Sequence, residues 1–122
     1  MSTSSIAELA KDVCSVRLGV TDIMKEPTAK LRGRVERLYN QKHAELSLKD
    51  KAYWPLNEIP EIMVGALSRI IAEEMCPGLG LQIPTEPDEN GTTVSMGTKG
   101  WRMLRRLLAE ARTGAETRSE YF

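Results

Sequence analysis

Few residues of this chain could do chemistry, and they do not form a catalytic or metal-binding pattern. His43 is the single histidine, and no cysteine or carboxylate lies four residues from it. A metal site needs several such ligands at matched spacing. Glu73 and Glu74 are adjacent, so on a helix their side chains diverge by about 100° and cannot share a site. We therefore expect no enzyme, no catalytic residue, no metal and no cofactor.

Two other features suggest structure rather than chemistry. Gly78-Leu79-Gly80 has neither the lysine nor the spacing of a phosphate-binding loop, and it follows an expected helix instead of preceding one. Cys14 and Cys76 lie 62 positions apart in helical patterns, with no paired-cysteine motif. We expect both to be reduced thiols in the core, with a disulfide as the alternative.

The best candidate for a functional surface is a set of cations near the C-terminus. On a helix they share the side away from the apolar face, opposed only by Glu110 at its edge. We call this set the basic crest, and it consists of Lys99, Arg102, Arg105, Arg106 and Arg112. Such a face can neutralise phosphates without reading sequence, pair with carboxylates of an acidic protein, or simply be solvated.

Composition is typical of one modest domain. The chain has 122 residues, 41% hydrophobic and 28% charged, with only six aromatic residues. No apolar run approaches the roughly 18–20 residues of a membrane span, and the polar start gives no reason to expect export. The shortage of aromatics and the lack of a helix-turn-helix pattern argue against sequence-specific nucleic-acid binding.

The net charge of zero hides an uneven distribution of charges. Residues 1–48 carry eight basic and six acidic groups, residues 49–90 carry three and eight, and residues 91–122 carry six and three. Segments of opposite sign can join copies of a chain through complementary faces. The alternative is that solvated surfaces scatter in this way by chance.

Four helices account for most of the chain. Ser5, with Glu8 three residues on, predicts a capping box for the first helix, which should end at Leu18-Gly19. Pro27 suits the first turn of a second helix that fades near residues 49–51. Its apolar stripe would be Leu31, Val35, Leu38, Tyr39 and Leu46.

The third and fourth helices should supply the core. Asn57 is the expected N-cap of the third helix, and Pro77-Gly78 its stop. A flanking strip of Gly65, Ser68 and Ala72 would let another helix approach closely. The fourth helix should run from about residue 98 to 112. The expected core residues are Ile59, Ile62, Met63, Ala66, Leu67, Ile70, Ile71, Trp101, Leu104 and Leu108.

Two segments are expected to lie outside the helices. The polar stretch Pro84–Gly97 reads as an exposed loop, with a small hairpin at Asn90-Gly91 as the alternative. Residues 113–122 lack an apolar stripe and should form an extended tail without regular structure until it is bound. The predicted fold is therefore all-α, with a helical bundle at residues 1–112 and a C-terminal tail at 113–122.

From about residue 50 onward, a series of short motifs follows a recognisable order. It consists of Ile59-Pro60-Glu61, the run from Ala66 to Glu74, Gly78-Leu79-Gly80, the run from Trp101 to Arg112, and Tyr121-Phe122. This order resembles the head-to-tail adaptor proteins of tailed bacteriophages, also called packaged-DNA-stabilisation or head-completion proteins and best known from short-tailed phages. The resemblance covers the first two helices only in outline.

The resemblance implies a structural role. Such proteins are small helical bundles that form a twelve-subunit ring beneath the portal protein, carry the next tail or nozzle protein, and help to retain packaged DNA. It implies a place in the virion neck after synthesis in the host cytoplasm. The tail would dock on the portal through Arg118, Tyr121 and Phe122, and the basic crest would face the DNA channel or a neighbouring subunit. The alternative is a small nucleic-acid-associated or regulatory protein that acts through the basic crest.

Overall fold

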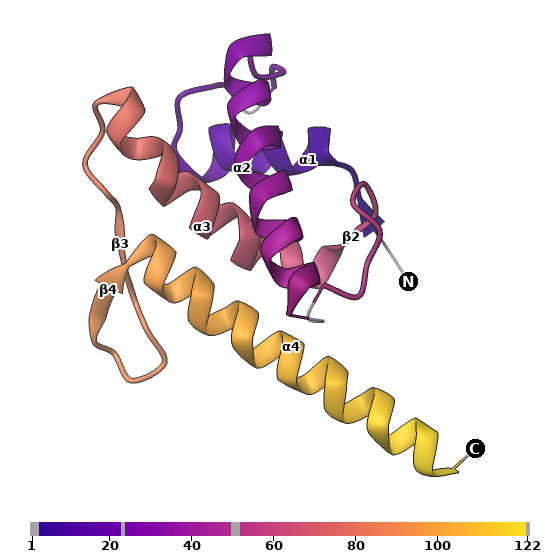
Figure 1. The fold of residues 1–122 in the computed structure, drawn as a ribbon. Coiled ribbons are helices and arrows are strands. Elements are labelled where there is room, and N and C mark those ends of the chain that lie inside the picture. The colour runs from indigo at the N-terminus through magenta and orange to yellow at the C-terminus, as the bar shows by residue number, and fades with distance from the viewer. Residues whose placement is uncertain (1–2, 23, 50–51, 122) are drawn as a thin grey trace.

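The computed structural model describes residues 3–22, 24–49 and 52–121, with side chains described up to residue 111. It is a small helical bundle, as the sequence predicts, with two short antiparallel ribbons (Figure 1). The elements in order are β1 (Thr3–Ser4), α1 (Ile6–Lys11), the π-helical segment η1 (Asp12–Arg17), α2 (Ala29–Leu48), β2 (Ile59–Pro60), α3 (Glu61–Leu79), β3 (Thr85–Pro87), β4 (Thr93–Ser95) and α4 (Met96–Tyr121).

The capping box at the start of α1 is confirmed. The Ser5 side chain accepts a hydrogen bond from the Glu8 amide at 3.2 Å, and the Glu8 carboxylate accepts one from the Ser5 amide at 3.3 Å. The helix widens into η1 at Asp12, which the apolar pattern does not reveal. Gly19, with φ +65°, follows in the left-handed conformation that glycine adopts without strain.

Two helices begin later than the sequence predicts. Thr28 caps α2 by accepting a hydrogen bond from the Leu31 amide, so Pro27 precedes the helix instead of starting it. Asn57 does not cap α3, which begins at Glu61. The side-chain oxygen of Asn57 instead accepts a hydrogen bond from the Ile6 amide at 3.1 Å. This contact ties the α2–α3 connection to the start of α1, where β1 pairs with β2.

The end of α3 also differs from the prediction. Pro77 lies inside the last turns, and the helix continues to Leu79. A proline there removes only the bond from its own nitrogen to the Glu73 carbonyl, a loss that the end of a long helix tolerates. Gly80, with φ +68°, then supplies the left-handed residue that ends the helix, and its amide bonds to the carbonyls of Cys76 and Pro77.

Most of the predicted core is confirmed. Fully or nearly fully buried are Ile59, Met63, Ala66, Leu67, Ile70, Ile71 and Leu104, while Trp101 and Leu108 are half-buried against them. The prediction that Ile62 belongs to the core is wrong, since 58% of this residue is exposed. It lies two helical turns before Arg69 and shares the polar edge of α3 that Arg69 occupies, whereas the buried stripe begins at Met63.

The first half of α4 packs against α3, and its second half extends beyond the bundle (Figure 1). Gly100 of α4 lies against the backbone of α3. A Cβ atom at Gly100 would lie 2.7 Å from the carbonyl oxygen of Ala66 and 2.9 Å from Cγ1 of Ile70. Within the predicted small-residue strip of α3, the Ser68 hydroxyl accepts a hydrogen bond from Nε of Arg17, a residue of η1, at 3.1 Å.

An aromatic network holds the α2–α3 connection against α2. The Tyr39 hydroxyl donates to the Leu56 carbonyl at 2.8 Å and accepts from Nε1 of Trp54 at 3.0 Å. His43 is half-buried beside them, with its Nε2 2.9 Å from the Trp54 carbonyl oxygen. His43 is thus a boundary residue, and it helps to fix Trp54 in place.

Both cysteines are free thiols in buried positions, as predicted. Burial raises the pKa of the Cys14 thiol. Burial also raises the pKa of Cys76, and the nearby Glu73 charge adds to that effect. These thiols therefore stay protonated at neutral pH and are poor nucleophiles.

Helix α4 is longer than predicted. It continues to Tyr121, past the expected end at Arg112, and Figure 1 shows its last turns projecting away from the bundle. Ala115, Glu116 and Arg118 are good helix formers, and extending an existing helix needs no new nucleation. Residues 113–121, which were expected to form a tail without regular structure, therefore continue α4 as a helix. The side chains of Arg112, Arg118, Tyr121 and Phe122 lie outside the described residues.

Candidate functional site

The segment between α3 and α4 forms a hairpin, so the expectation of an exposed loop is wrong and the alternative of a small hairpin around Asn90-Gly91 is confirmed. β3 and β4 pair antiparallel, with Glu86 opposite Val94. Asp88 organises the turn because its Oδ1 accepts hydrogen bonds from the amides of Asn90 and Thr92, each at 2.9 Å. Gly91 has φ +80° within this turn. The two prolines do not prevent pairing because the strands are only three residues long and the side chain of Asp88 closes the turn.

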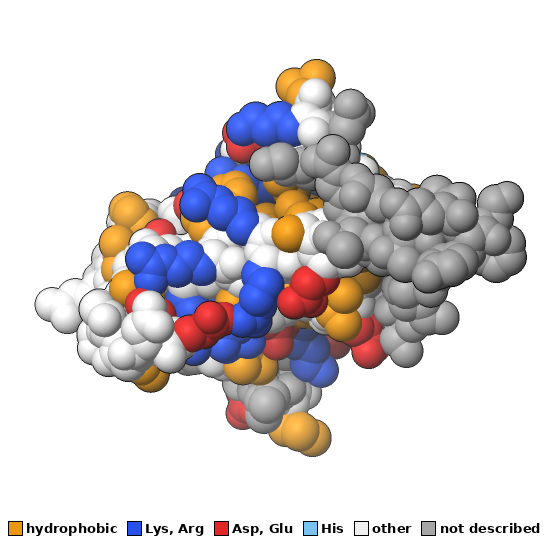
Figure 2. Space-filling model, turned by 90° about the horizontal axis from the view of Figure 1, so that it is seen from below, with side chains coloured by type: hydrophobic (Ala, Val, Ile, Leu, Met, Phe, Trp, Pro, Cys, Tyr) orange, Lys and Arg blue, Asp and Glu red, His pale blue; other side chains and the backbone are white. Residues whose placement is uncertain are grey.

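The hairpin places carboxylates against the basic crest. Lys99 Nζ lies 3.6 Å from Oε1 of Glu86, and Arg102 Nη1 lies 2.7 Å from Oδ2 of Asp88. A third ion pair joins Arg106 to Glu89. Figure 2 shows basic and acidic side chains intermingled on this face. The expectation that only Glu110 opposes the crest is therefore wrong, because the opposing acids come from the preceding hairpin.

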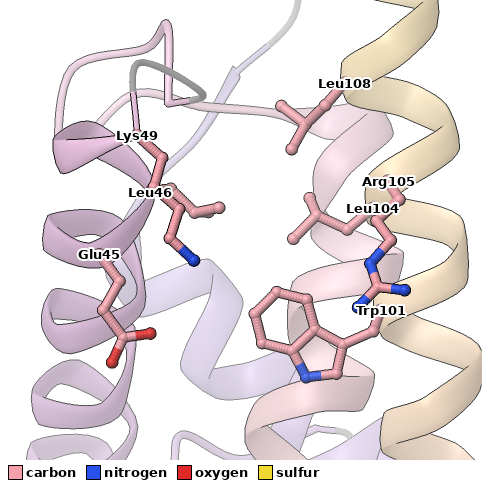
Figure 3. A pocket seen from close by; sticks show the side chains of 7 residues that line it. All are labelled: Glu45, Leu46, Lys49, Trp101, Leu104, Arg105 and Leu108. Atoms are coloured by element: carbon pink, nitrogen blue, oxygen red, sulfur yellow. The ribbon is translucent and has the colours of Figure 1, made fainter.

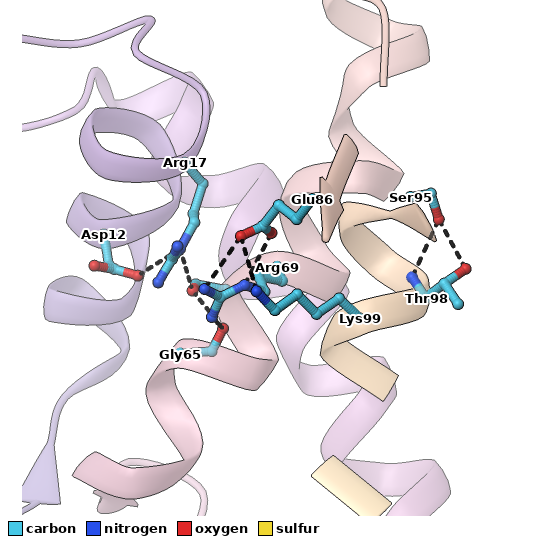
Figure 4. Close-up of polar contacts among 9 residues, drawn as sticks. Asp12, Arg17, Gly65, Arg69, Glu86, Ser95, Thr98 and Lys99 are labelled. Atoms are coloured by element: carbon cyan, nitrogen blue, oxygen red, sulfur yellow. Dashed lines mark hydrogen bonds and ion pairs between the residues drawn. The ribbon is translucent and has the colours of Figure 1, made fainter. Parts of the chain in front are cut away.

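Glu86 anchors the hairpin to α3 as well as to α4. Its carboxylate accepts hydrogen bonds from Nε and Nη2 of Arg69 at 2.9 and 3.3 Å, while Nη1 of Arg69 donates to the Gly65 carbonyl (Figure 4). Partial burial on its own would raise the pKa of Glu86. The Arg69 hydrogen bonds and the charges of Arg69, Lys99 and Arg17 outweigh it and hold that pKa below its usual range.

The pKa of Asp88 is shifted in the same direction for a related reason. Desolvation on its own would raise its pKa, but the backbone hydrogen bonds from Thr92 and Asn90 and the neighbouring Arg102 together lower it. Both hairpin carboxylates therefore stay ionised at neutral pH.

The ion pairs differ in exposure along the hairpin. At its base, the Arg69 and Glu86 side chains are mostly buried. At its tip, 56% of the Arg102 side chain and 51% of the Arg106 side chain remain exposed. On the hairpin side, 75% of the Glu89 side chain is exposed but only 9% of Asp88. Pairs that are exposed on both sides, such as Arg106–Glu89, contribute only about 0–1 kcal/mol and weaken with salt, so the hairpin is held least firmly at Glu89.

Arg105 lies apart from the crest cations that pair with the hairpin, because it lines a small pocket. Arg105 does not face the hairpin but lines a cavity of about 110 Å³ between α2 and α4 (Figure 3). Its other lining residues are Glu45, Leu46, Lys49, Trp101, Leu104 and Leu108. Sites for small molecules usually span roughly 300–1,000 Å³, so this volume does not suit a cofactor.

Large apolar side chains are exposed where α2 ends and α3 begins. Leu48 is 88% exposed, Tyr53 52% and Ile62 58%, and Leu56 also reaches the surface. These residues lie within fifteen positions of the sequence. Scattered exposed apolar residues are ordinary, but several from one segment can mark a contact surface.

Neither a metal site nor a membrane-spanning helix is found in the described parts of the chain. Among the residues from 3 to 111 that the structure describes, no three His, Cys, Asp or Glu side chains converge as a metal site would require. None of the described helices is both long and apolar enough to cross a bilayer.

Known proteins give no independent guide to this surface. Comparison with protein-family models, with curated proteins and with solved structures finds no match. Function must therefore be argued from the hairpin, the crest, the exposed apolar segment and the projecting helix.

Proposed function

We propose that this chain is a structural adaptor subunit of a tailed bacteriophage. In this role, copies form a ring beneath the portal, link the head to the tail and help to retain the packaged DNA. The proposal starts from the resemblance of residues 50–122 to such adaptors. It makes the chain an assembly component of the virion neck, with the portal, the tail protein and other copies of itself as partners.

The observation that carries the proposal is the shape of α4. Its first half is held on α3 by the close contact at Gly100, and its last turns project away from the bundle (Figure 1). A helix that is fixed at one end and projects at the other can serve as an arm for a partner. Tyr121 and Phe122 at its end are residue types that anchor interfaces when they fill pockets.

The bundle also exposes large apolar side chains that a neighbouring subunit could cover. Leu48, Tyr53 and Ile62 are exposed apolar side chains near one another in sequence. Burying them against a neighbour would remove apolar area from water, which stabilises association by about 25 cal/mol per Å² before the costs of binding are subtracted.

The pairing of the crest weighs against the alternative of a nucleic-acid-associated protein. Lys99, Arg102 and Arg106 already have carboxylate partners in the hairpin. With these cations paired, the crest of the free chain has few charges left to neutralise phosphates. Assembly is therefore the better primary role.

Portal binding by tail variants tests the proposal. The chain would be titrated against immobilised portal rings of the phage that encodes it, and compared with a variant lacking residues 119–122. We expect the deletion to weaken binding at least about tenfold, a loss of about 1.4 kcal/mol, because it removes both aromatic anchors. The melting temperature should not change.

A matched pair of point variants separates the aromatics from the tail's length. Y121A/F122A should reproduce the deletion, whereas S119A/E120A should bind within about twofold of the parent chain. Full portal affinity in the deletion variant would rule out the anchor, and no portal binding by the parent chain would contradict the proposed function.

A further inference from the structure

The spacing of the crest residues that meet the hairpin is regular. Lys99, Arg102 and Arg106 follow one stripe of α4, and each pairs with a different hairpin carboxylate. At 1.5 Å of rise per residue, the stripe spans roughly 10 Å. The hairpin thus presents a short row of negative charges to a matching row of cations.

The same row matches a phosphate backbone. One DNA strand carries a negative charge about every 3.4 Å along the helix axis, so roughly 10 Å of crest corresponds to about three phosphates. Lys99 also lies in the first turn of α4, where the helix dipole favours anions. The hairpin carboxylates therefore occupy the place that phosphates would take.

The structure of the hairpin allows its tip to separate from α4 while its base remains bound to α3. Each strand has only three residues, and a two-stranded hairpin of this size is marginally stable alone. Glu86 at the base is fixed by two hydrogen bonds from Arg69. Arg102 and Arg106, which hold the tip, are half exposed to solvent.

We propose that the tip of the β3–β4 hairpin is an intramolecular mask over the basic crest, which the phosphate backbone of double-stranded DNA displaces. The inference deepens the proposed function, on whose DNA contact it rests. In the free subunit, Asp88 and Glu89 neutralise Arg102 and Arg106. Close to concentrated phosphates, the arginines exchange carboxylate partners for phosphates. The contact has no sequence preference.

The test measures DNA binding by the isolated full chain. A D88N/E89Q variant removes both tip charges, while the side-chain amide that D88N introduces keeps an oxygen for the turn amides. Fluorescence anisotropy with a short labelled DNA duplex reports the affinity. The matched control is E36Q/E58Q, which makes the same change in net charge at exposed carboxylates for which no ion pair is found among the described residues. Melting temperatures establish that both variants are folded.

We expect D88N/E89Q to bind about tenfold more tightly than the control, which corresponds to about 1.4 kcal/mol. Two freed arginines should also steepen the salt dependence of log K by roughly 1.8, at about 0.9 per phosphate contact. Equal affinities and equal salt slopes in the two variants would overturn the mask, because net charge would then explain the gain.

The arginines give a second, independent readout. R102Q/R106Q should lower DNA affinity by at least about fivefold more in the D88N/E89Q background than in the parent chain, because only there are the arginines unmasked. The same loss in both backgrounds would contradict masking.

Poly-glutamate in place of DNA tests the other class of partner. If D88N/E89Q gains affinity for poly-glutamate and none for DNA, the crest takes an acidic protein surface and the DNA proposal is wrong. None of these measurements involves a portal, so this inference and the adaptor role can fail separately.

Discussion

Replacing Gly100 with alanine tests the contact that fixes α4 on α3. Alanine is favoured over glycine within a helix by about 1 kcal/mol, so α4 considered alone would become more stable. In the folded protein, however, the new Cβ atom would lie 2.7 Å from the Ala66 carbonyl oxygen and 2.9 Å from Cγ1 of Ile70. Backbone cannot move aside as a flexible side chain can, and overpacking of this kind costs typically about 1–3 kcal/mol.

The clash should therefore exceed the gain in helix propensity. We expect G100A to lower the free energy of unfolding by up to about 2 kcal/mol, the overpacking cost of about 1–3 kcal/mol less the gain of about 1 kcal/mol in helix propensity, measured by urea titration with far-UV circular dichroism. Gly33 provides the matched control, because it lies inside α2 and its Cβ would meet no atom within 4 Å. G33A should stabilise the protein by about 0.5–1 kcal/mol. If both variants gained the same stability, the close α3–α4 approach would be refuted.

Three further predictions concern stability. I70A should cost about 2–5 kcal/mol in a urea titration and I62A no more than about 0.5, because Ile70 is buried and Ile62 exposed; similar losses would contradict that difference in burial. Y39F should cost about 1–3 kcal/mol in thermal unfolding, since it removes two hydrogen bonds of a buried network; an unchanged melting temperature would show that the network contributes nothing. The pKa values of Glu86 and Asp88 are lower in the folded than in the unfolded chain, so their stabilisation is complete above the unfolded pKa of about 4 and is lost as pH falls through the lower folded values. E86Q should weaken the dependence of the unfolding midpoint on pH across that acidic range. A pH dependence equal to that of the parent chain would show that Glu86 does not contribute to it.

What the sequence predicts well is local. The capping box depends on Ser5 and Glu8, three residues apart, and the pattern contains both partners. The buried stripe from Met63 to Ile71 follows from helical periodicity alone, and so does the burial of Leu104. The stripe of Lys99, Arg102 and Arg106 is visible for the same reason, whereas Arg105, which the sequence groups with them, lines the pocket between α2 and α4.

What the sequence does not predict depends on distant partners. Asn57 has the residue type of an N-cap, yet it bonds to Ile6, 51 residues away. In the sequence, the two prolines argue against a hairpin in this segment. The hairpin forms because the side chain of Asp88 closes its turn and ion pairs to α4 set its position. A helical pattern also cannot show that Gly100 is a point of close approach, since only the fold brings Ala66 beside it.

The mass of a portal complex tests the central claim most directly. Purified portal rings would be mixed with an excess of the chain, and the complex isolated by gel filtration with light scattering. The adaptor role predicts that the portal gains one full ring of 13.6-kDa subunits, bound at a fixed ratio and lost when residues 119–122 are deleted. A portal whose mass does not change at saturating concentrations of the chain would contradict it.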